Sequence, residues 1–239
     1  MPLTPIQRRS VPDDVFEQLV AEVTGGGLGP GESLPSERRL AEVLGVSRPA
    51  VREAMQRLAQ AGLVDVRQGD TTTVRDFRRS GGLDLLPRLL LPGGELDLSV
   101  ARSILEARLL IGPKVAELAA VRGRLDVAAL RVTVRALEAA EDLVQRHRHA
   151  LEFWEQVVDA ADSIAFRLMF NSLRAAYEPT LEALASLMAD EVDHIEKYDA
   201  VVDALAAGNG AIARRRAEEL LDPATNSLFH AIELLEAAE

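Results

Sequence analysis

The sequence of 239 residues predicts a mainly α-helical protein, with an N-terminal winged helix-turn-helix and a C-terminal all-α antiparallel helical bundle. Three observations predict this fold. Two short helices joined by a tight Gly-containing turn lie in the first 60 residues. One stretch that alternates apolar and polar residues follows them. From residue 98 onward the pattern is almost entirely helical. We expect domains at 1–75 and 98–239, joined by a linker with a short helix at 76–97.

Composition restricts the class of protein. The chain has no cysteine, so its sequence offers no disulfide, no zinc–thiolate site and no cysteine nucleophile. The first residues lack the apolar region of a signal peptide, and no apolar run approaches the length of a membrane span. We therefore expect a cytoplasmic protein without membrane contact. The net charge of −11 arises entirely after residue 80, because residues 1–80 carry 11 Arg and 11 acidic residues.

The first helix is predicted by an apolar face in "PDDVFEQLVAEV", residues 12–23. A glycine-rich stretch ends it, and a short second helix is expected from the N-cap Ser36 to the stop at Gly45. Ser47 can cap the third helix, "SRPAVREAMQRLAQAG", in which Pro49 lies in the first turn, where its missing N–H is tolerated. The apolar face of the first helix contains Val15, Phe16, Leu19, Val20 and Val23.

The third helix has two distinct faces. Its apolar residues, from Val51 to Leu58, share one arc, while Arg48, Arg52 and Gln56 follow one another at four-residue spacing on the other side. Arginines near the N-terminus of such a helix can reach base edges in the major groove. Solvated charges on an amphipathic helix are the alternative interpretation. The turn, the caps and the hairpin in "LVDVRQGDTTTVRDF" together favour DNA binding.

The segment "SLPSERRLAEVLGVSRPAVREAMQRLAQAGLVDVRQGDTTTV" resembles the GntR family of bacterial transcription regulators. The resemblance implies that Glu37 organises Arg38, and that the wing tip enters the minor groove. Relatives more often carry His at the position of Gln68 and a polar residue at that of Ala50. The positions that the resemblance implies in DNA binding are Arg38, Ser47, Arg48, Ala50, Arg52, Gln68 and Gly69.

In the second domain, helical phase places several polar residues on inward faces. Arg108 shares a stripe with Ile104, Ile111 and Val115, and an arginine among core positions needs a partner. That partner is either a carboxylate of the bundle or an anionic ligand. The expected helices cover residues 98–122, 126–147, 149–161, 163–188, 190–207 and 210–236.

Three further polar or aromatic residues share this inward phase: Trp154, the only tryptophan, Asn171 and Tyr198. Each one alone is typical of core packing with a satisfied hydrogen bond. Together with Arg108 they indicate a ligand-binding cavity. The basic cluster "ARRRAEE" at 213–219 is interpreted as a solvated face, because three consecutive helical residues cannot all line one pocket.

The second domain resembles the effector domain of the FadR subgroup of GntR regulators. Many members bind a metal through an Asp, a His four residues later and two further His. The matching positions are Ala150, Trp154, Tyr198 and the region near Leu220, so we expect no metal and no cofactor.

The resemblance extends to the fatty-acyl-CoA-responsive members of this subgroup, through "VRDFRRSGGLDLL" and "FRLMFNSLRAAY". It implies that a long-chain fatty acyl-CoA or fatty acid binds near Arg108, Trp154, Asn171 and Tyr198 and weakens DNA affinity. The alternative effector is a small carboxylate, with or without a metal displaced toward His147, His149 and Glu152.

We therefore expect a homodimeric, ligand-responsive regulator that binds a pseudo-palindromic operator, because two heads related by a two-fold axis match two half-sites. An enzyme is disfavoured by the absence of a Ser/His/Asp motif, a P-loop, a dinucleotide fingerprint and HExxH. An architectural protein that uses its helical domain only for dimerisation is the third possibility.

Overall fold

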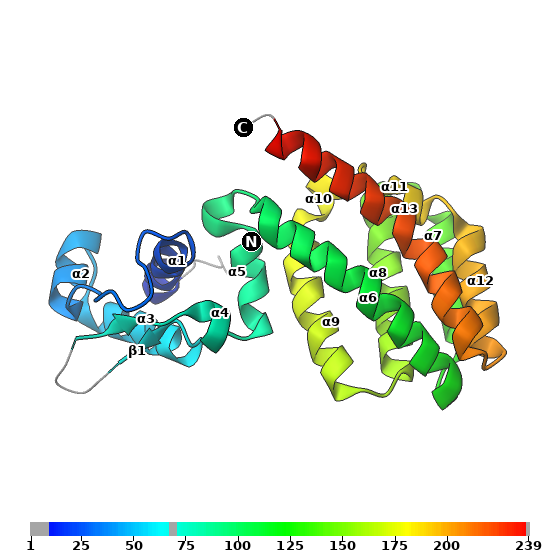
Figure 1. Ribbon diagram of the computed structural model, residues 1–239, viewed down its shortest axis with the longest axis horizontal. Coiled ribbons are helices and arrows are strands. Elements are labelled where there is room, and N and C mark those ends of the chain that lie inside the picture. Colours follow the sequence, from blue (N-terminus) through cyan, green and yellow to red (C-terminus); the bar gives the residue numbers. More distant parts are fainter. Residues whose placement is uncertain (1–9, 67–70, 238–239) are drawn as a thin grey trace, which may run out of the picture. The chain divides into compact units, whose positions relative to one another are not determined.

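The computed structural model describes residues 10–66 and 71–237, and the chain divides into two compact units, Met1–Asp97 and Leu98–Glu239. The prediction of a winged helix-turn-helix followed by an all-helical domain is confirmed. Figure 1 shows the elements of both units. The first unit contains α1 (Val11–Thr24), α2 (Glu37–Leu44), α3 (Arg48–Gln60), β1 (Val64–Asp65), β2 (Thr73–Val74), α4 (Phe77–Ser80), η1 (Leu83–Leu85), α5 (Leu86–Leu90) and η2 (Pro92–Gly94).

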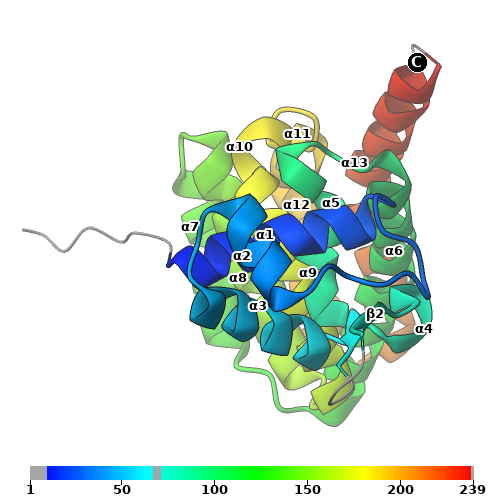
Figure 2. The same ribbon diagram turned by 90° about the vertical axis from the view of Figure 1, so that its left-hand side faces the viewer.

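In the first unit, termed the head below, helices α1, α2 and α3 (Figure 2) pack around one apolar core. Ser10 caps α1 in a reciprocal capping box with Asp13. The apolar faces predicted for α1 and α3 are confirmed as buried. Their buried residues are Val15, Phe16, Leu19, Val20, Val23, Val51, Ala54, Met55 and Leu58.

Beside these helices lies a small antiparallel ladder, the base of the wing. Val64 pairs with Val74 and Asp65 with Thr73, and Ser33 adds a bridge to Thr73. Val64 and Val74 are both buried, so the ladder joins the core of the head. Gln68 and Gly69, predicted at the wing tip, lie outside the described residues.

The segment 76–97, expected as a linker, lies within the first compact unit. Leu85 is buried in the core of the head, and Phe77 and Leu89 pack against that core. The Ser80 hydroxyl donates to the Gly62 carbonyl at 2.8 Å. Gly62 has a φ of +73°, and an added Cβ would lie 2.5 Å from the Ser80 carbonyl oxygen. Glycine is therefore required where this segment approaches the end of α3.

The described residues of the second unit form helices joined by turns and loops and contain no strand. Helices α6 and α13 run side by side over much of their length (Figure 1), and α7, α8 and α12 complete the main core. The elements are α6 (Leu98–Arg122), α7 (Val127–Ala139), α8 (Leu143–Ala160), α9 (Ile164–Tyr177), η3 (Glu178–Thr180), α10 (Leu181–Leu184), α11 (Ala189–Val192), α12 (Ile195–Ala206) and α13 (Gly210–Glu236).

Some of the predicted helices differ from the structure, and one of them, predicted over 190–207, is divided at 193–194 into α11 and α12. The chain breaks at 140–142 instead of at residue 148, because the Asp142 carboxylate accepts the Gln145 N–H at 3.0 Å and caps α8. The predicted helix 163–188 ends at Tyr177. Pro179 follows in η3, where it supplies no backbone N–H for a continuing helix.

Candidate nucleic-acid interface and buried polar cluster

The N-terminus of α3 carries the predicted DNA-contacting side chains on an exposed surface. The Ser47 hydroxyl accepts the Ala50 N–H at 3.4 Å, which fixes the first turn of the helix. Arg48 and Arg52 lie one turn apart on α3, and both are exposed. Arg38, near the start of α2, has a side chain that is 75% exposed. The surface formed by Arg38, Ser47, Arg48 and Arg52 is termed the α3 surface below.

Arg52 is oriented by a carboxylate on the preceding helix. Its Nε lies 3.1 and 3.2 Å from the two Glu37 carboxylate oxygens, and its Nη2 lies 2.9 Å from Glu37 Oε2. This hydrogen bonding lowers the pKa of Glu37 and raises that of Arg52. The expectation that Glu37 organises Arg38 is therefore wrong, since Arg38 lies instead 3.6 Å from Glu42.

Ala50 does not share this exposed surface. It is 7% exposed and precedes Ala54 and Leu58 at four-residue spacing, so it lies on the packed face of α3. The resemblance predicted DNA contact here from the position alone. Because α3 packs through this face, the methyl group of Ala50 is almost inaccessible.

Inside the helical domain, Arg108 of α6 has a partner within the chain. Its guanidinium forms a salt bridge with Glu191 of α11 and donates from Nη1 to the Thr225 hydroxyl of α13 at 2.9 Å. Glu191 is 3% exposed and the Arg108 side chain 22%. Burial opposes the charge of Arg108, but the adjacent carboxylate outweighs it and raises the pKa of the guanidinium. The bundle carboxylate, one of the two predicted partners, is therefore present as Glu191.

Trp154 and Tyr198 lie in the same core and leave their polar atoms unused. Trp154 is 8% exposed and Tyr198 fully buried, and each ring meets Phe153 edge-to-face. Trp154 Nε1 and the Tyr198 hydroxyl have no hydrogen-bond partner among the described residues. An unsatisfied buried polar group costs about 1–3 kcal/mol. The core therefore contains two donors available to an acceptor.

A glycine on α6 makes room near the indole. A Cβ added at Gly112 would lie 2.5 Å from Leu221 Cδ1 and 3.8 Å from Trp154 Cη2. Gly112 is one helical turn beyond Arg108. Trp154 thus packs close to α6, and its ring is part of the main core of the helical domain.

His147 and Tyr177 lie near the Arg108–Glu191 pair, and we term this set the polar cluster: Arg108, His147, Tyr177, Glu191, Tyr198 and Thr225. The His147 ring lies 3.1 Å from the Ala185 carbonyl oxygen through Nε2 and 3.3 Å from the Tyr177 hydroxyl through Nδ1. Burial lowers the pKa of His147 and raises the pKa of Tyr177. Sequence reasoning missed Glu191, because it lies in the short helix α11, whereas the predicted helix over 190–207 joins α11 to α12.

Asn171 is exposed and does not belong to the polar cluster. Its predicted stripe includes Ile164 and Leu168, which are 75% and 56% exposed. Instead, α9 packs Phe166 and Phe170 against the core, a different face of the helix. The prediction of an inward Asn171 is wrong because the alternative apolar face of α9 contains the larger side chains.

Of the positions that the resemblance matches to metal ligands, only Tyr198 carries an oxygen atom on its side chain. Ala150, Trp154 and Leu220 are buried, and the described residues contain no group of three or more His, Asp or Glu that could hold a metal ion. His149 faces Glu152 at 2.9 Å, without a third potential ligand. A displaced metal site near these two residues therefore has no geometric support within the described chain.

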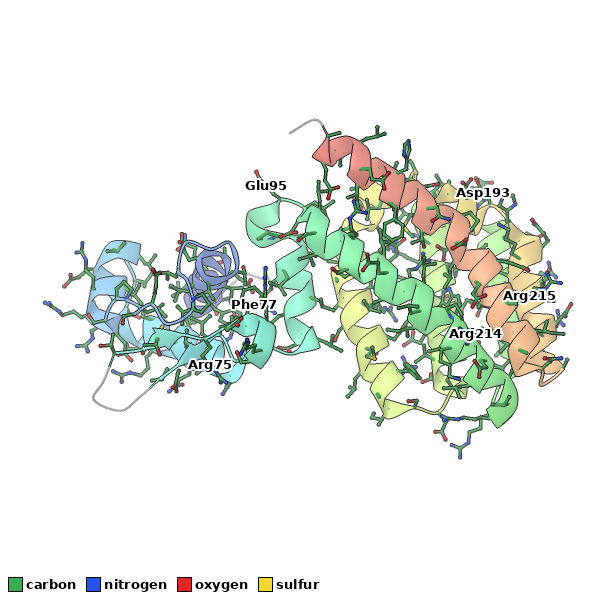
Figure 3. The ribbon with its side chains drawn as sticks, in the orientation of Figure 1. Arg75, Phe77, Glu95, Asp193, Arg214 and Arg215 are labelled. Carbon is green, nitrogen blue, oxygen red and sulfur yellow. The ribbon has the colours of Figure 1, made fainter. Side chains whose placement is uncertain are left out.

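The basic cluster on α13 is paired with carboxylates. Figure 3 labels Arg214 and Arg215 on this helix. Arg214 lies 3.1 Å from Glu218, Arg215 lies 3.7 Å from Glu219, and Arg216 lies 2.6 Å from Glu219. These contacts agree with the solvated, charge-balanced face expected from the sequence.

Residues 12–74 match the family model described as "Bacterial regulatory proteins, gntR family", and residues 103–223 match the FCD domain. The chain is 58% identical over 230 residues to the HTH-type transcriptional regulator Mce2R of Mycobacterium tuberculosis, covering 96% of each chain. The chain belongs to the GntR family. This GntR protein is therefore a transcriptional regulator with an FCD ligand-binding domain, and not an enzyme.

More distant relatives of this GntR regulator include the fatty acid metabolism regulator protein of Vibrio cholerae. The two are 32% identical over 126 residues, which cover 53% of this chain and 44% of the relative. The structure of Lar from Listeria monocytogenes has the same fold, with a TM-score of 0.61, 17% identity, and coverage of 94% of this chain and 99% of Lar. Among its described residues, this regulator has no helix long and apolar enough to cross a membrane.

Proposed function

We propose that this regulator binds a palindromic operator as a homodimer through the α3 surface, and that a long-chain fatty acyl-CoA or fatty acid in the helical domain lowers its DNA affinity. The observation that carries the effector proposal is a pair of unpartnered donors, Trp154 Nε1 and the Tyr198 hydroxyl, inside an apolar core. An acyl chain matches such a core, and its carbonyl oxygen matches the donors.

For DNA binding, support comes from the geometry of α3. The cap at Ser47 defines where the helix begins, and Arg48 and Arg52 project from its first two turns. Glu37 holds one edge of the Arg52 guanidinium, which leaves Nη1 without a hydrogen bond to Glu37. Arginine donors in this position are suited to guanine O6 and N7.

The DNA proposal is tested with Arg48→Ala and Arg52→Ala, assayed by fluorescence anisotropy on a duplex selected from a random pool by the wild-type protein. Each lost bidentate contact is expected to weaken specific binding by about 1–3 kcal/mol. Arg215→Ala, which removes an exposed arginine from α13, is the matched control and is expected to bind normally. Unchanged specific affinity in both α3 variants at fixed salt would refute the proposal.

The effector proposal is tested by titrating the fluorescence of Trp154, which is the only tryptophan in the chain. Oleoyl-CoA is expected to change this emission saturably and to release the selected duplex. A flat titration at micromolar ligand, with no release of DNA, would contradict an acyl effector. Stoichiometric metal in protein purified without chelator would instead favour the small-carboxylate alternative.

A further inference from the structure

Glu37 contacts Arg52 in a way that divides the donors of the guanidinium into two edges. Arg52 Nε lies 3.1 and 3.2 Å from the two carboxylate oxygens of Glu37, and Nη2 lies 2.9 Å from Oε2. A guanidinium has five N–H donors in one plane. The edge formed by Nε and Nη2 faces Glu37, whereas the distal edge, formed by Nη1 and the second N–H of Nη2, has no partner within residues 10–66 and 71–237. Such a distal edge carries two parallel donors, which match O6 and N7 of a guanine.

The position of Glu37 is fixed by the start of α2. Glu37 is the first residue of this helix and follows the N-cap Ser36, whose hydroxyl accepts the Arg39 N–H at 3.3 Å. The helix dipole favours a carboxylate in the first turn. Glu37 is also the less exposed partner, with a side chain 31% exposed against 58% for Arg52. The helix-turn-helix therefore holds the carboxylate beside the first turns of α3, and the guanidinium extends past it toward solvent.

The pairing also cancels the charge through which Arg52 would attract a phosphate. Hydrogen bonding from Arg52, together with the charges of Arg52 and Arg48, holds the pKa of Glu37 below its usual value, so the carboxylate is ionised at neutral pH. Glu37 and Arg52 together then carry no net charge. Arg48 forms no ion pair with any residue that the structure describes, so it keeps its full charge for either kind of DNA contact. Attraction to the phosphate backbone depends on net positive charge, whereas base recognition depends on directed donors.

We propose that Glu37 is the positioning residue that gives Arg52 its base specificity: it aims the distal edge of the guanidinium at one guanine and keeps Arg52 from binding phosphate instead. The inference rests on the proposed DNA contact of Arg52 and assigns the source of its selectivity. Without the carboxylate, the guanidinium can rotate and bind a nearby phosphate oxygen. Loss of Glu37 therefore lowers discrimination between sequences but does not lower affinity for DNA of unrelated sequence.

The test compares base preferences after selection from a random duplex pool at fixed salt, with the bound duplexes sequenced for each protein. Arg52→Ala is expected to lose a guanine preference of about tenfold to a hundredfold at one position of each half-site. Glu37→Gln, an isosteric change, is expected to lose about fivefold or more of the preference at that same position and none elsewhere. Its affinity for a duplex of unrelated sequence should not fall. Glu53→Gln removes an exposed carboxylate of α3 that has no ion pair with a described residue, and it should leave every base preference unchanged.

A double variant separates this role from a purely structural one. In an Arg52→Ala background, Glu37→Gln should change no further base preference, because the side chain that it positions is already gone. If Glu37→Gln does not fold, Glu37→Ala takes its place, since alanine is a good helix former. An unchanged preference without the carboxylate, or a loss at a base pair that Arg52→Ala leaves intact, would overturn the role of Glu37. If the wild-type protein selects no sequence, or Arg52→Ala loses no preference, the proposed DNA contact itself fails.

Discussion

At the scale of single residues, the described structure separates side chains that look alike in the sequence. Arg52 and Arg108 are both arginines on amphipathic helices. One is exposed and oriented by Glu37, and the other is held inside the bundle by Glu191. The four histidines divide in the same way, since His147 alone is buried. Burial, more than residue type, decides which of these groups can respond to pH or to a ligand.

The buried histidine predicts a pH dependence of stability. An unfolded histidine has a pKa of about 6.5, and burial lowers the pKa of His147 in the folded protein. The unfolded chain therefore takes up the proton more readily, so this contribution is present above about pH 6.5 and is lost as the pH falls below it. We expect the melting temperature of wild-type protein to fall more between pH 7.5 and 5.5 than that of His147→Gln.

His230→Gln is the matched control for this experiment, because the His230 side chain is 72% exposed. The melting temperature of His230→Gln should change with pH in the same way as that of the wild-type protein. A His147→Gln variant with the same decrease as the wild type would show that His147 does not titrate on unfolding in this range. Thermal denaturation followed by circular dichroism measures all three proteins.

At the scale of elements, α9 differs from its neighbours in how it is attached. Ala176 is its only buried residue, while Ile164 and Leu168 are largely exposed. Phe166 and Phe170 pack against the core from a partly buried position. Ion pairs between arginines of α9 and carboxylates of α8 also hold α9 on the bundle. Such an element, with few buried apolar contacts, is expected to open at a lower free energy than the paired helices α6 and α13.

The carboxylate of Glu155 on α8 joins two arginines of α9, Arg167 at 3.3 Å and Arg174 at 2.8 Å. Glu155→Gln removes the charge at the centre of these pairs. We expect amide hydrogen exchange in α9 to become faster and exchange in α6 and α13 to change little. Each lost ion pair is partly exposed, so its loss is expected to lower the free energy of opening α9 by about 0–1 kcal/mol.

Mass spectrometry of the exchanged peptides measures this effect. Glu138→Gln is the control, because Glu138 pairs with Arg135 within α7 and joins no second helix. Unchanged exchange in α9, or an equal increase in every helix of the unit, would contradict the proposed attachment through Glu155.

At the scale of the whole molecule, charge is divided between the two compact units. The first unit carries 12 basic and 14 acidic residues and the second carries 15 basic and 24 acidic residues, whereas the exposed arginines of the α3 surface belong to the first unit. An acidic protein can therefore still bind a polyanion, because local charge at the contact surface governs the interaction.

This division predicts how salt acts on DNA binding by the proposed homodimer. Arg38, with a side chain 75% exposed, is suited to a phosphate contact, and loss of one such contact changes the salt slope by about 0.9. A dimer on two half-sites loses two contacts in Arg38→Ala. The slope of log K against log salt should therefore become shallower by about 1.8, measured by anisotropy on the selected duplex.

Light scattering on the same samples should give a mass of twice the 25.9 kDa chain. Arg215→Ala is expected to leave the slope unchanged. A monomeric mass, or a slope change near 0.9, would contradict the binding of both half-sites by one dimer.

The sequence by itself determined the helix-turn-helix, the apolar faces of α1 and α3, and the inward position of Arg108, Trp154 and Tyr198. These features depend on caps, turns and helical period, which are local properties. Only the tertiary structure decided that Glu191 pairs with Arg108, that Glu37 holds Arg52, and that Asn171 faces outward. Each of these depends on which helices meet. Glu191 lies 83 positions from Arg108 along the chain, and helical period carries no information about contacts at such a separation.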